Sequence, residues 1–262
     1  MPILPSILDS IGIIRNKLFL YKNSDFYFPD FIGIGAQKSG TTWLYKNMLE
    51  HPEIFLPKIK EIHFFDWYFY KGIQWYSNIF SNIKQRKKGE ITPGYSIISE
   101  KKIKLIQKIN PKLKIILLLR NPVERAWSHA VMNLSTIPNK EINEITNNEF
   151  IKHFNSTSSI ERGNYPKIIN KWSKFFPKEQ IFIANYNKIK EAPDHLLNDI
   201  FKFLEVEKIS SFKDFPINEK ILPIKRSKTK NTISAELNKY LMNYYKDDLN
   251  YLKNINQDLS WE

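Results

Sequence analysis

The chain has 262 residues, 42% of them hydrophobic and 14% aromatic, which is enough to bury the core of one large α/β domain or two small ones. Its 40 lysines and arginines exceed its 27 acidic residues, and the formal net charge of +13 attracts polyanions such as nucleotides, anionic glycans or nucleic acid. A chain rich in Lys, Ile and Asn can also acquire such a charge through biased codon usage alone. Cysteine is absent, which excludes disulfides, thiolate metal sites and thiol nucleophiles.

The N-terminal segment carries no sign of a leader or a membrane span. Two prolines, Asp9 and Arg15 interrupt its apolar residues, so neither a signal-peptide core nor a spanning helix fits. We therefore expect an N-terminal extension over residues 1–30, a single domain over residues 31–262, and a cytoplasmic location.

A strand, a loop and a helix are predicted between residues 31 and 52. Phe31 to Ala36 is a short apolar run, and beyond the loop apolar residues recur at helical spacing until Pro52. Three of the eight glycines, Gly33, Gly35 and Gly40, fall at this junction. Glycines permit tight turns, and a helix N-terminus presents unpaired N–H groups to an anion. The pattern indicates a phosphate-binding loop, whose residues are Gln37, Lys38, Ser39, Gly40, Thr41 and Thr42.

The next elements are an aromatic-rich stretch from His63 to Phe80, a strand at Gly89 to Thr92 and a helix from Ser99 to Ile109. Aromatic faces stack on sugars and also fill cores, so the aromatic stretch fits a carbohydrate acceptor and a core role equally well.

A second strand followed by a helix is predicted from Ile115 onward. The aliphatic run Ile115 to Leu119 suits a buried strand and ends in Arg120. Asn121 can cap a helix that has Pro122 in its first turn, and a glutamate three residues after the asparagine can complete a capping box.

The remaining elements alternate in the same way. They are a helix from Tyr165 to Phe175, a strand at Gln180 to Ala184, a helix from Pro193 to Leu204, and a final helix from Ile233 to about Leu252. This alternation predicts an α/β fold with a mostly parallel central sheet flanked by helices and a P-loop-like strand, loop and helix.

The identity of the phosphate compound depends on where the lysine of the loop lies. A Walker A motif places lysine directly after its second glycine, whereas here Thr41 follows Gly40 and the lysine is Lys38. Nucleotide triphosphatases also hold Mg²⁺ with a carboxylate near a neighbouring strand end, where this chain has Arg120. These departures favour a metal-free site for a ligand with an extra phosphate, and a P-loop kinase of a nucleoside or small metabolite is the alternative.

Several motifs together resemble one family. Gln37 to Leu44 resembles the 5′-phosphosulfate loop of sulfotransferases that use 3′-phosphoadenosine 5′-phosphosulfate (PAPS), and Arg120 to Ser128 resembles their 3′-phosphate motif. Lys60 to Asp66 and Gly89 to Pro93 resemble stretches of the heparan sulfate sulfotransferase branch. The likeness covers most of the chain from Phe31 onward.

The resemblance implies roles for the donor-binding residues. Lys38 and the loop to Thr42 would hold the 5′-phosphate, where a lysine stabilises the charge that builds up as the S–O bond breaks. Arg120 and Ser128 would grip the 3′-phosphate. The other implied contacts are Trp43, against adenine, and Lys225 and Arg226, in a basic loop closing over the 3′-phosphate. The heparan branch has a glycine between that lysine and arginine, and this chain lacks it.

The acceptor must lose a proton as it attacks sulfur, and Glu61 is the predicted general base. The resemblance assigns His63 and Asp66 to orienting this carboxylate or touching the acceptor. In an extended segment, Glu61 and His63 point to the same side, and burial beside Phe64 and Phe65 is expected to raise the pKa of Glu61. Glu90 is the competing base and an acceptor-side candidate.

Other functions remain open from the residues alone. The charge and the aromatic residues by themselves would also suit a nucleic-acid-binding protein, but no recognition-helix or RNA-binding signature is present, so we expect no nucleic-acid partner. An inactive sulfotransferase scaffold is a third possibility, but the presence of Lys38, Glu61, Arg120 and Ser128 gives no hint of lost activity. We expect PAPS as co-substrate, no metal and a glycan or glycan-like acceptor, while the choice between O- and N-sulfation and the oligomeric state stay undecided.

Overall fold

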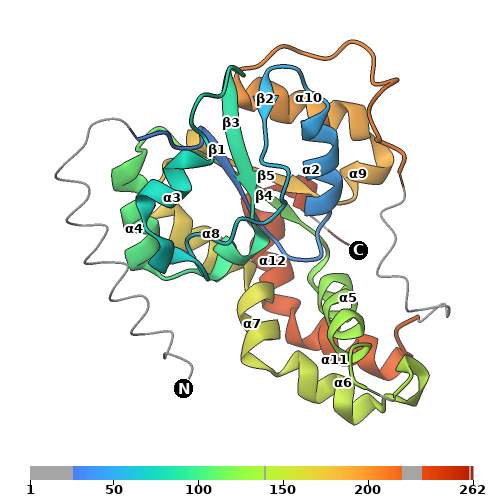
Figure 1. Cartoon of the computed structure of the whole chain (residues 1–262). Helices are drawn as coiled ribbons and strands as arrows, with labels where there is room; N and C mark the ends of the chain where they lie inside the picture. The colour runs from blue at the N-terminus through green and yellow to red at the C-terminus, as the bar shows by residue number, and fades with distance from the viewer. Residues whose placement is uncertain (1–25, 139, 220–231, 260, 262) are drawn as a thin grey trace.

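The computed structural model describes residues 26–138, 140–219, 232–259 and 261, and Figure 1 shows their arrangement. One five-stranded sheet has the order β2-β3-β1-β4-β5, and every strand pair in it is parallel. The strands are β1 (Phe31–Gly35), β2 (Ile54–Phe55), β3 (Lys87–Ile91), β4 (Lys114–Leu119) and β5 (Ile181–Asn185). The prediction of a parallel, helix-flanked sheet is confirmed.

The two central strands explain why the sequence predicts the sheet well. All five residues of β1 are buried, as are the last five of β4. A parallel strand covered on both faces reads as a continuous apolar run, and these two runs are the clearest in the sequence. Ile32 pairs with Ile115 on one side and with Glu90 on the other.

Helices cover both faces of the sheet (Figure 1). One face carries α3 (Ile73–Asn78), α4 (Glu100–Ile109) and α8 (Tyr165–Ser173), with the buried rings of Phe64, Tyr76 and Trp172 among them. The opposite face carries α2 (Thr41–Leu49), α9 (Lys188–Glu191) and α10 (Pro193–Leu204). None of the helices in the described part of the chain is long and apolar enough to cross a membrane.

A separate group of helices, here called the helical lobe, lies beyond the carboxyl ends of the central strands (Figure 1). It consists of α5 (Pro122–Leu134), α6 (Asn147–Phe154), α7 (Thr157–Gly163) and α11 (Ala235–Tyr244). Its core is formed by side chains such as Val123, Phe150 and Leu241. From the lobe, α12 (Lys246–Ile255) runs back towards the sheet and buries Leu252 against the core that α8 covers.

Short 3₁₀ helices complete the fold: η1 (Phe69–Lys71), η2 (Pro93–Ile97), η3 (Ile142–Glu144), η4 (Lys178–Gln180) and η5 (Gln257–Leu259). The expected single helix from Ile233 to Leu252 is wrong, because the chain divides into α11 and α12 at Tyr245. Tyr245 is buried, and its hydroxyl lies 3.5 Å from Nη2 of the buried Arg125. Tyr245 therefore packs inside the lobe at the point where α11 ends and α12 begins.

Candidate functional site

The predicted phosphate-binding loop leaves β1 at the end of the sheet where β4 also ends. Because β1 and β4 are adjacent and parallel, residues after Gly35 and after Leu119 lie at the same edge. Gly40 ends the loop in the left-handed region (φ 84°), and a Cβ atom there would lie 2.3 Å from Cδ1 of Ile189. No side chain caps the N-terminus of α2, so the unpaired N–H groups and the helix dipole are free for an anion.

Lys38 extends from this loop towards the helical lobe. Its Nζ lies 3.7 Å from Sδ of Met132 on α5, and no carboxylate among the described residues forms an ion pair with it. Burial and the neighbouring charge of Arg120 lower the pKa of Lys38. A half-buried ammonium that contacts a thioether, with a second cation near it, suits an anionic ligand that would supply the counter-charge.

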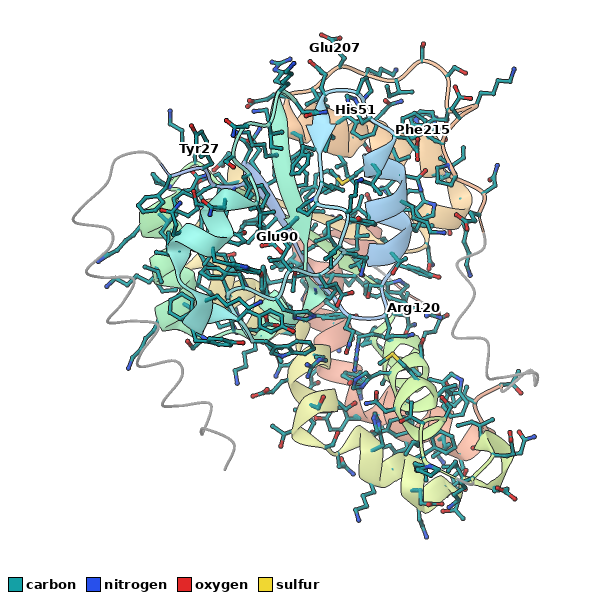
Figure 2. All side chains as sticks on the ribbon, in the orientation of Figure 1. Tyr27, His51, Glu90, Arg120, Glu207 and Phe215 are labelled. Carbon is teal, nitrogen blue, oxygen red and sulfur yellow. The ribbon has the colours of Figure 1, made fainter. Side chains whose placement is uncertain are left out.

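Arg120 lies at the end of β4, at the junction between the sheet and the helical lobe (Figure 2). Its guanidinium lies 4.9 Å from the ring centre of Tyr186, and its Nε donates to Oε2 of Glu124 at 2.9 Å. Stacking and one ion pair orient the arginine while leaving its other N–H groups for a phosphate. Ser128 is half-buried on α5, two turns beyond Asn121, whose side chain caps that helix as predicted.

Three further residues are expected from the sequence to contact the donor: Trp43, Lys225 and Arg226. Trp43 is only 2% exposed, packs in the core beneath α2, and donates from its indole nitrogen to the carbonyl of Ile217 at 2.9 Å. An indole buried in this way has no open face for adenine, so the structure favours packing as the role of Trp43. The predicted contacts Lys225 and Arg226 lie outside the described residues.

Glu61, His63 and Asp66 form a connected group. Nε2 of His63 lies 3.3 Å from Oε2 of Glu61, and Nδ1 of His63 lies 2.8 Å from Oδ2 of Asp66. Lys60 also donates to Oε1 of Glu61. The expected extended backbone is wrong, because φ is 66° at Glu61 and 54° at His63. The side chains meet through a tight left-handed turn, a conformation that costs free energy for residues other than glycine.

The electrostatics of this group also differ from expectation. Burial raises the pKa of Glu61, but hydrogen bonds from His63 and Lys60 outweigh it and lower the pKa to about 2. Burial similarly opposes charge on His63, yet Asp66 and Glu61 raise the pKa of His63 to about 9. The predicted upward shift of the Glu61 pKa is therefore wrong, and at neutral pH the group is an imidazolium between two carboxylates.

Glu90, the competing base, is enclosed in the core. It is 2% exposed, and the hydroxyls of Tyr76, Thr92 and Tyr95 all donate to it. Burial raises its pKa to about 7 despite these donors. A pKa near neutrality suits a general base, but a carboxyl surrounded by three hydroxyls has no path to an acceptor. Figure 2 shows Glu90 deep within the sheet region, and the geometry favours Glu61.

Tyr95 links Glu90 to the segment that carries Glu61. Its hydroxyl donates to Oε1 of Glu90 at 3.0 Å and accepts from the backbone N–H of Phe64 at 2.9 Å. The neighbouring Gly94 allows close approach, since a Cβ there would lie 2.4 Å from Oδ2 of Asp66. Glu90 is thus connected through Tyr95 to the segment that carries the predicted base, Glu61.

The same 3₁₀ helix, η2, connects the acidic group to the phosphate loop. A Cβ at Gly35 would lie 3.3 Å from the carbonyl oxygen of Pro93, and Gly94 contacts Asp66 and His63. The carboxylates and the phosphate-binding edge therefore flank one short segment. His129 is buried on α5, where burial and the charge of Arg125 lower its pKa to about 3.

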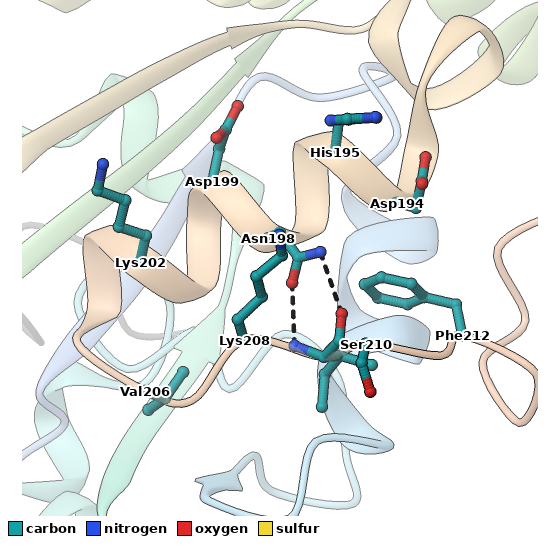
Figure 3. Close-up of a pocket in the computed structure, with 10 residues that line it drawn as sticks. Asp194, His195, Asn198, Asp199, Lys202, Val206, Lys208, Ser210 and Phe212 are labelled. Atoms are coloured by element: carbon teal, nitrogen blue, oxygen red, sulfur yellow. Dashed lines mark hydrogen bonds between the residues drawn. The ribbon is translucent and has the colours of Figure 1, made fainter.

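Sequence reasoning missed several residues of this region. Tyr186 follows β5, and the rule that parallel strands end at one edge would have placed it beside Arg120. Lys60 and Met132 carry no such signal, because their roles depend on the loop backbone and on how α5 packs. A surface hollow along α10 and residues 206–212 (Figure 3) is lined by both acidic and basic side chains and by none of the predicted site residues.

The fold and the site together define an α/β protein with a P-loop-like turn, a cation in place of the metal-binding carboxylate, and an acidic group at the same end of the sheet. Residues 28–250 match the sulfotransferase domain family. The chain belongs to the sulfotransferase family, and sulfotransferases are enzymes. The predicted resemblance is confirmed.

The chain is similar to several known proteins. It is 30% identical to mouse heparan sulfate glucosamine 3-O-sulfotransferase 3B1 over 73% of this chain and 50% of that protein. It is 25% identical to the membrane-associated sulfotransferase kil1 of Dictyostelium discoideum over 89% of this chain and 66% of that protein. The chain thus spans between half and two thirds of these relatives.

Solved structures show the same fold. A sulfotransferase from Alicyclobacillus acidocaldarius matches with a TM-score of 0.67 at 22% identity, over 87% of this chain and 95% of that one. Mouse sulfotransferase SULT7A1, solved in complex with PAP, matches with a TM-score of 0.56 at 16% identity, over 86% of each chain.

Proposed function

We propose that the chain transfers a sulfuryl group from PAPS to a hydroxyl or amine of a carbohydrate acceptor. One observation carries the proposal: Lys38, without a carboxylate partner among the described residues, lies at the uncapped N-terminus of α2 with the charge of Arg120 near it. Two cations at a helix N-terminus match a donor that carries phosphate at both ends of its ribose. Ser128 and the loop from Gln37 to Thr42 would complete this donor site.

The reaction would be an in-line displacement without a metal. The acceptor oxygen or nitrogen forms a bond to sulfur, the bond from sulfur to the bridging phosphate oxygen breaks, and the acceptor proton moves to Glu61. Lys38 stabilises the charge that appears on the departing phosphate. Glu61 is ionised at neutral pH, and it accepts the proton as bond formation to sulfur acidifies the attacking group. His63 and Asp66 hold the carboxylate in place.

The carbohydrate acceptor rests on the heparan sulfate sulfotransferases to which the chain is similar, and on the positive net charge. The proposed acceptor group is a sugar hydroxyl or amine. The cytoplasmic location expected from the sequence stays a separate prediction.

Calorimetric titration with the product nucleotide 3′-phosphoadenosine 5′-phosphate, beside 5′-AMP and Mg-ATP, tests the donor. Metal-independent binding that requires the 3′-phosphate and weakens at least about tenfold in Arg120→Ala is expected. Arg86→Ala is the matched control, since Arg86 is exposed and pairs with Glu53 far from the loop. Preference for Mg-ATP, or indifference to the 3′-phosphate, would instead support the kinase.

Incorporation of ³⁵S from labelled PAPS into heparan sulfate oligosaccharides then tests the acceptor. Glu61→Gln keeps the shape of the side chain and removes the base, so nucleotide binding should persist while transfer is lost. If Glu61→Gln transfers sulfate at the unmodified rate, Glu61 is not the base.

A further inference from the structure

Trp67 is exposed although large aromatic side chains favour burial. The chain has six tryptophans, all of them within the described residues, and Trp67 alone is exposed, with 62% of its surface open to solvent. By contrast, Trp43 and Trp172 are almost completely buried. An exposed indole beside a candidate active site is a feature of surfaces that bind a ligand.

The exposed indole is also held rigidly. Its ring stacks on the imidazole of His63, with 3.6 Å between ring centres and 8° between planes. Its backbone N–H donates to the carbonyl of His63 at 3.0 Å and to Oδ1 of Asp66 at 3.0 Å. Because His63 covers one face of the indole, the opposite face accounts for the exposure. Trp67 therefore presents a flat apolar face without having to be ordered first.

This face lies next to the proposed base. The imidazole that stacks on Trp67 is the one whose Nε2 lies 3.3 Å from Glu61, so a single imidazole ring separates the indole from the carboxylate. Ile59, on the other side of Glu61 in the chain, is 77% exposed and adds apolar surface to the same segment. An acceptor whose hydroxyl reaches Glu61 thus lies within reach of the free face of Trp67.

We propose that Trp67 is the stacking platform for the acceptor ring, and that it selects acceptors presenting the C–H face of a pyranose. The inference deepens the proposed function and rests on it. The π-face of an indole is electron-rich and attracts C–H groups, while it repels anionic substituents. The platform would therefore place the uncharged face of the sugar against the protein and direct its carboxylate or sulfate groups away from the indole, towards solvent or basic side chains.

Steady-state kinetics with a heparan sulfate oligosaccharide and PAPS test the platform. Trp67→Ala should raise the KM for the oligosaccharide about five- to tenfold, while kcat and the KM for PAPS stay within about threefold. Trp67→Phe, which keeps a flat ring, should recover most of the loss. Tyr244→Ala, which removes an exposed aromatic ring from α11, is the matched control and should change neither constant.

The outcomes separate the inference from the function on which it rests. An unchanged oligosaccharide KM in Trp67→Ala overturns the platform and leaves the sulfotransferase proposal intact. A fall in kcat with a shifted pH profile would mean that Trp67 acts only by supporting His63, which also overturns the platform. Failure of the unmodified protein to sulfate any sugar, with product-nucleotide binding retained, overturns the carbohydrate acceptor and the platform together.

Discussion

The hydroxyl of Tyr95 donates to Oε1 of Glu90 at 3.0 Å, and this buried pair holds the segment that carries the proposed base. The same hydroxyl accepts the backbone N–H groups of Phe64 and Phe65, at 2.9 and 3.4 Å. In the proposed reaction, Glu90 would thus act indirectly, through a tyrosine that bonds to the backbone next to His63.

Tyr95→Phe should separate positioning from donor binding. The ring is kept and the hydroxyl is lost, so the N–H of Phe64 and one oxygen of Glu90 lose a buried partner, at a cost of about 1–3 kcal/mol. We expect a lower midpoint in urea unfolding and a reduced kcat, with product-nucleotide affinity unchanged. Equal loss of nucleotide affinity would contradict a role confined to the Glu61 segment.

The raised pKa of Glu90 predicts that its contribution to stability decreases as pH rises. Burial raises its pKa to about 7, above the value of the unfolded chain, so its contribution is fully present below pH 4.5 and is lost as pH rises through about 7. Glu90→Gln cannot ionise and should flatten the stability curve across this window. Urea unfolding at pH 4.5, 6 and 7.5 measures the difference, and parallel curves for the two proteins would contradict the shift.

The contribution of His63 to stability also decreases as pH rises, but in a higher pH range than that of Glu90. The pKa of His63 is raised to about 9, so its stabilising contribution is complete below pH 6.5 and disappears as pH rises through about 9. Loss of the imidazolium also leaves Glu61 and Asp66 without their shared cation, and the transfer rate should fall in the same range. An NMR titration of the His63 ring gives the pKa directly, and a value near 6.5 would remove the basis of the prediction.

Lys38→Ala should affect the rate more than binding. Because the lysine stabilises charge that grows in the transition state, kcat should fall about 10²- to 10³-fold, while affinity for the product nucleotide falls less. Lys46→Ala is the control: Lys46 lies on α2 and pairs with Glu219 at 2.6 Å. A loss confined to the KM for PAPS would restrict Lys38 to ground-state binding.

Gly94→Ala should disturb the acidic group alone. Its Cβ would lie 2.4 Å from Oδ2 of Asp66, so the carboxylate must move from His63. We expect the pKa of His63 to fall and transfer to drop, with nucleotide binding retained. The double variant Gly94→Ala with Asp66→Ala removes the carboxylate that the new methyl group would contact. Its kcat should therefore be no lower than that of Asp66→Ala alone, which a double-mutant comparison would verify.

The sequence predicts the sheet and most of its helices because the relevant signals are local. The runs at β1 and β4, the cap at Asn121 and the ends of α10 follow from neighbouring residues. The helical lobe is harder to foresee, since α5 and α6 pack with α11, which follows far along the chain. The break at Tyr245 lies where this ring meets Arg125, a partner 120 positions earlier that no local pattern reveals.

For the candidate site, too, the sequence predicts some features and not others. The identity of Lys38, Arg120 and Glu61 as candidates could be predicted from motifs, but their conformations could not. Among the described residues, five other than glycine have a positive φ, and Lys38, Glu61 and His63 are three of them. Such backbone strain concentrates where a fold positions reactive groups, and residue types such as lysine and glutamate give no warning of it.

The helical lobe also dictates the order in which the site can be assembled during synthesis. Its core joins α5 and α6 to α11, and the contact of Arg125 with Tyr245 spans 120 positions of the chain. On a ribosome, the loop that carries Lys38 and the sheet strands emerge before α11, so α5, whose Met132 contacts Lys38, gains its α11 partner only when the last helices emerge. We therefore expect a nascent chain to form the turn that carries Lys38 before the helical lobe beside it is fully packed.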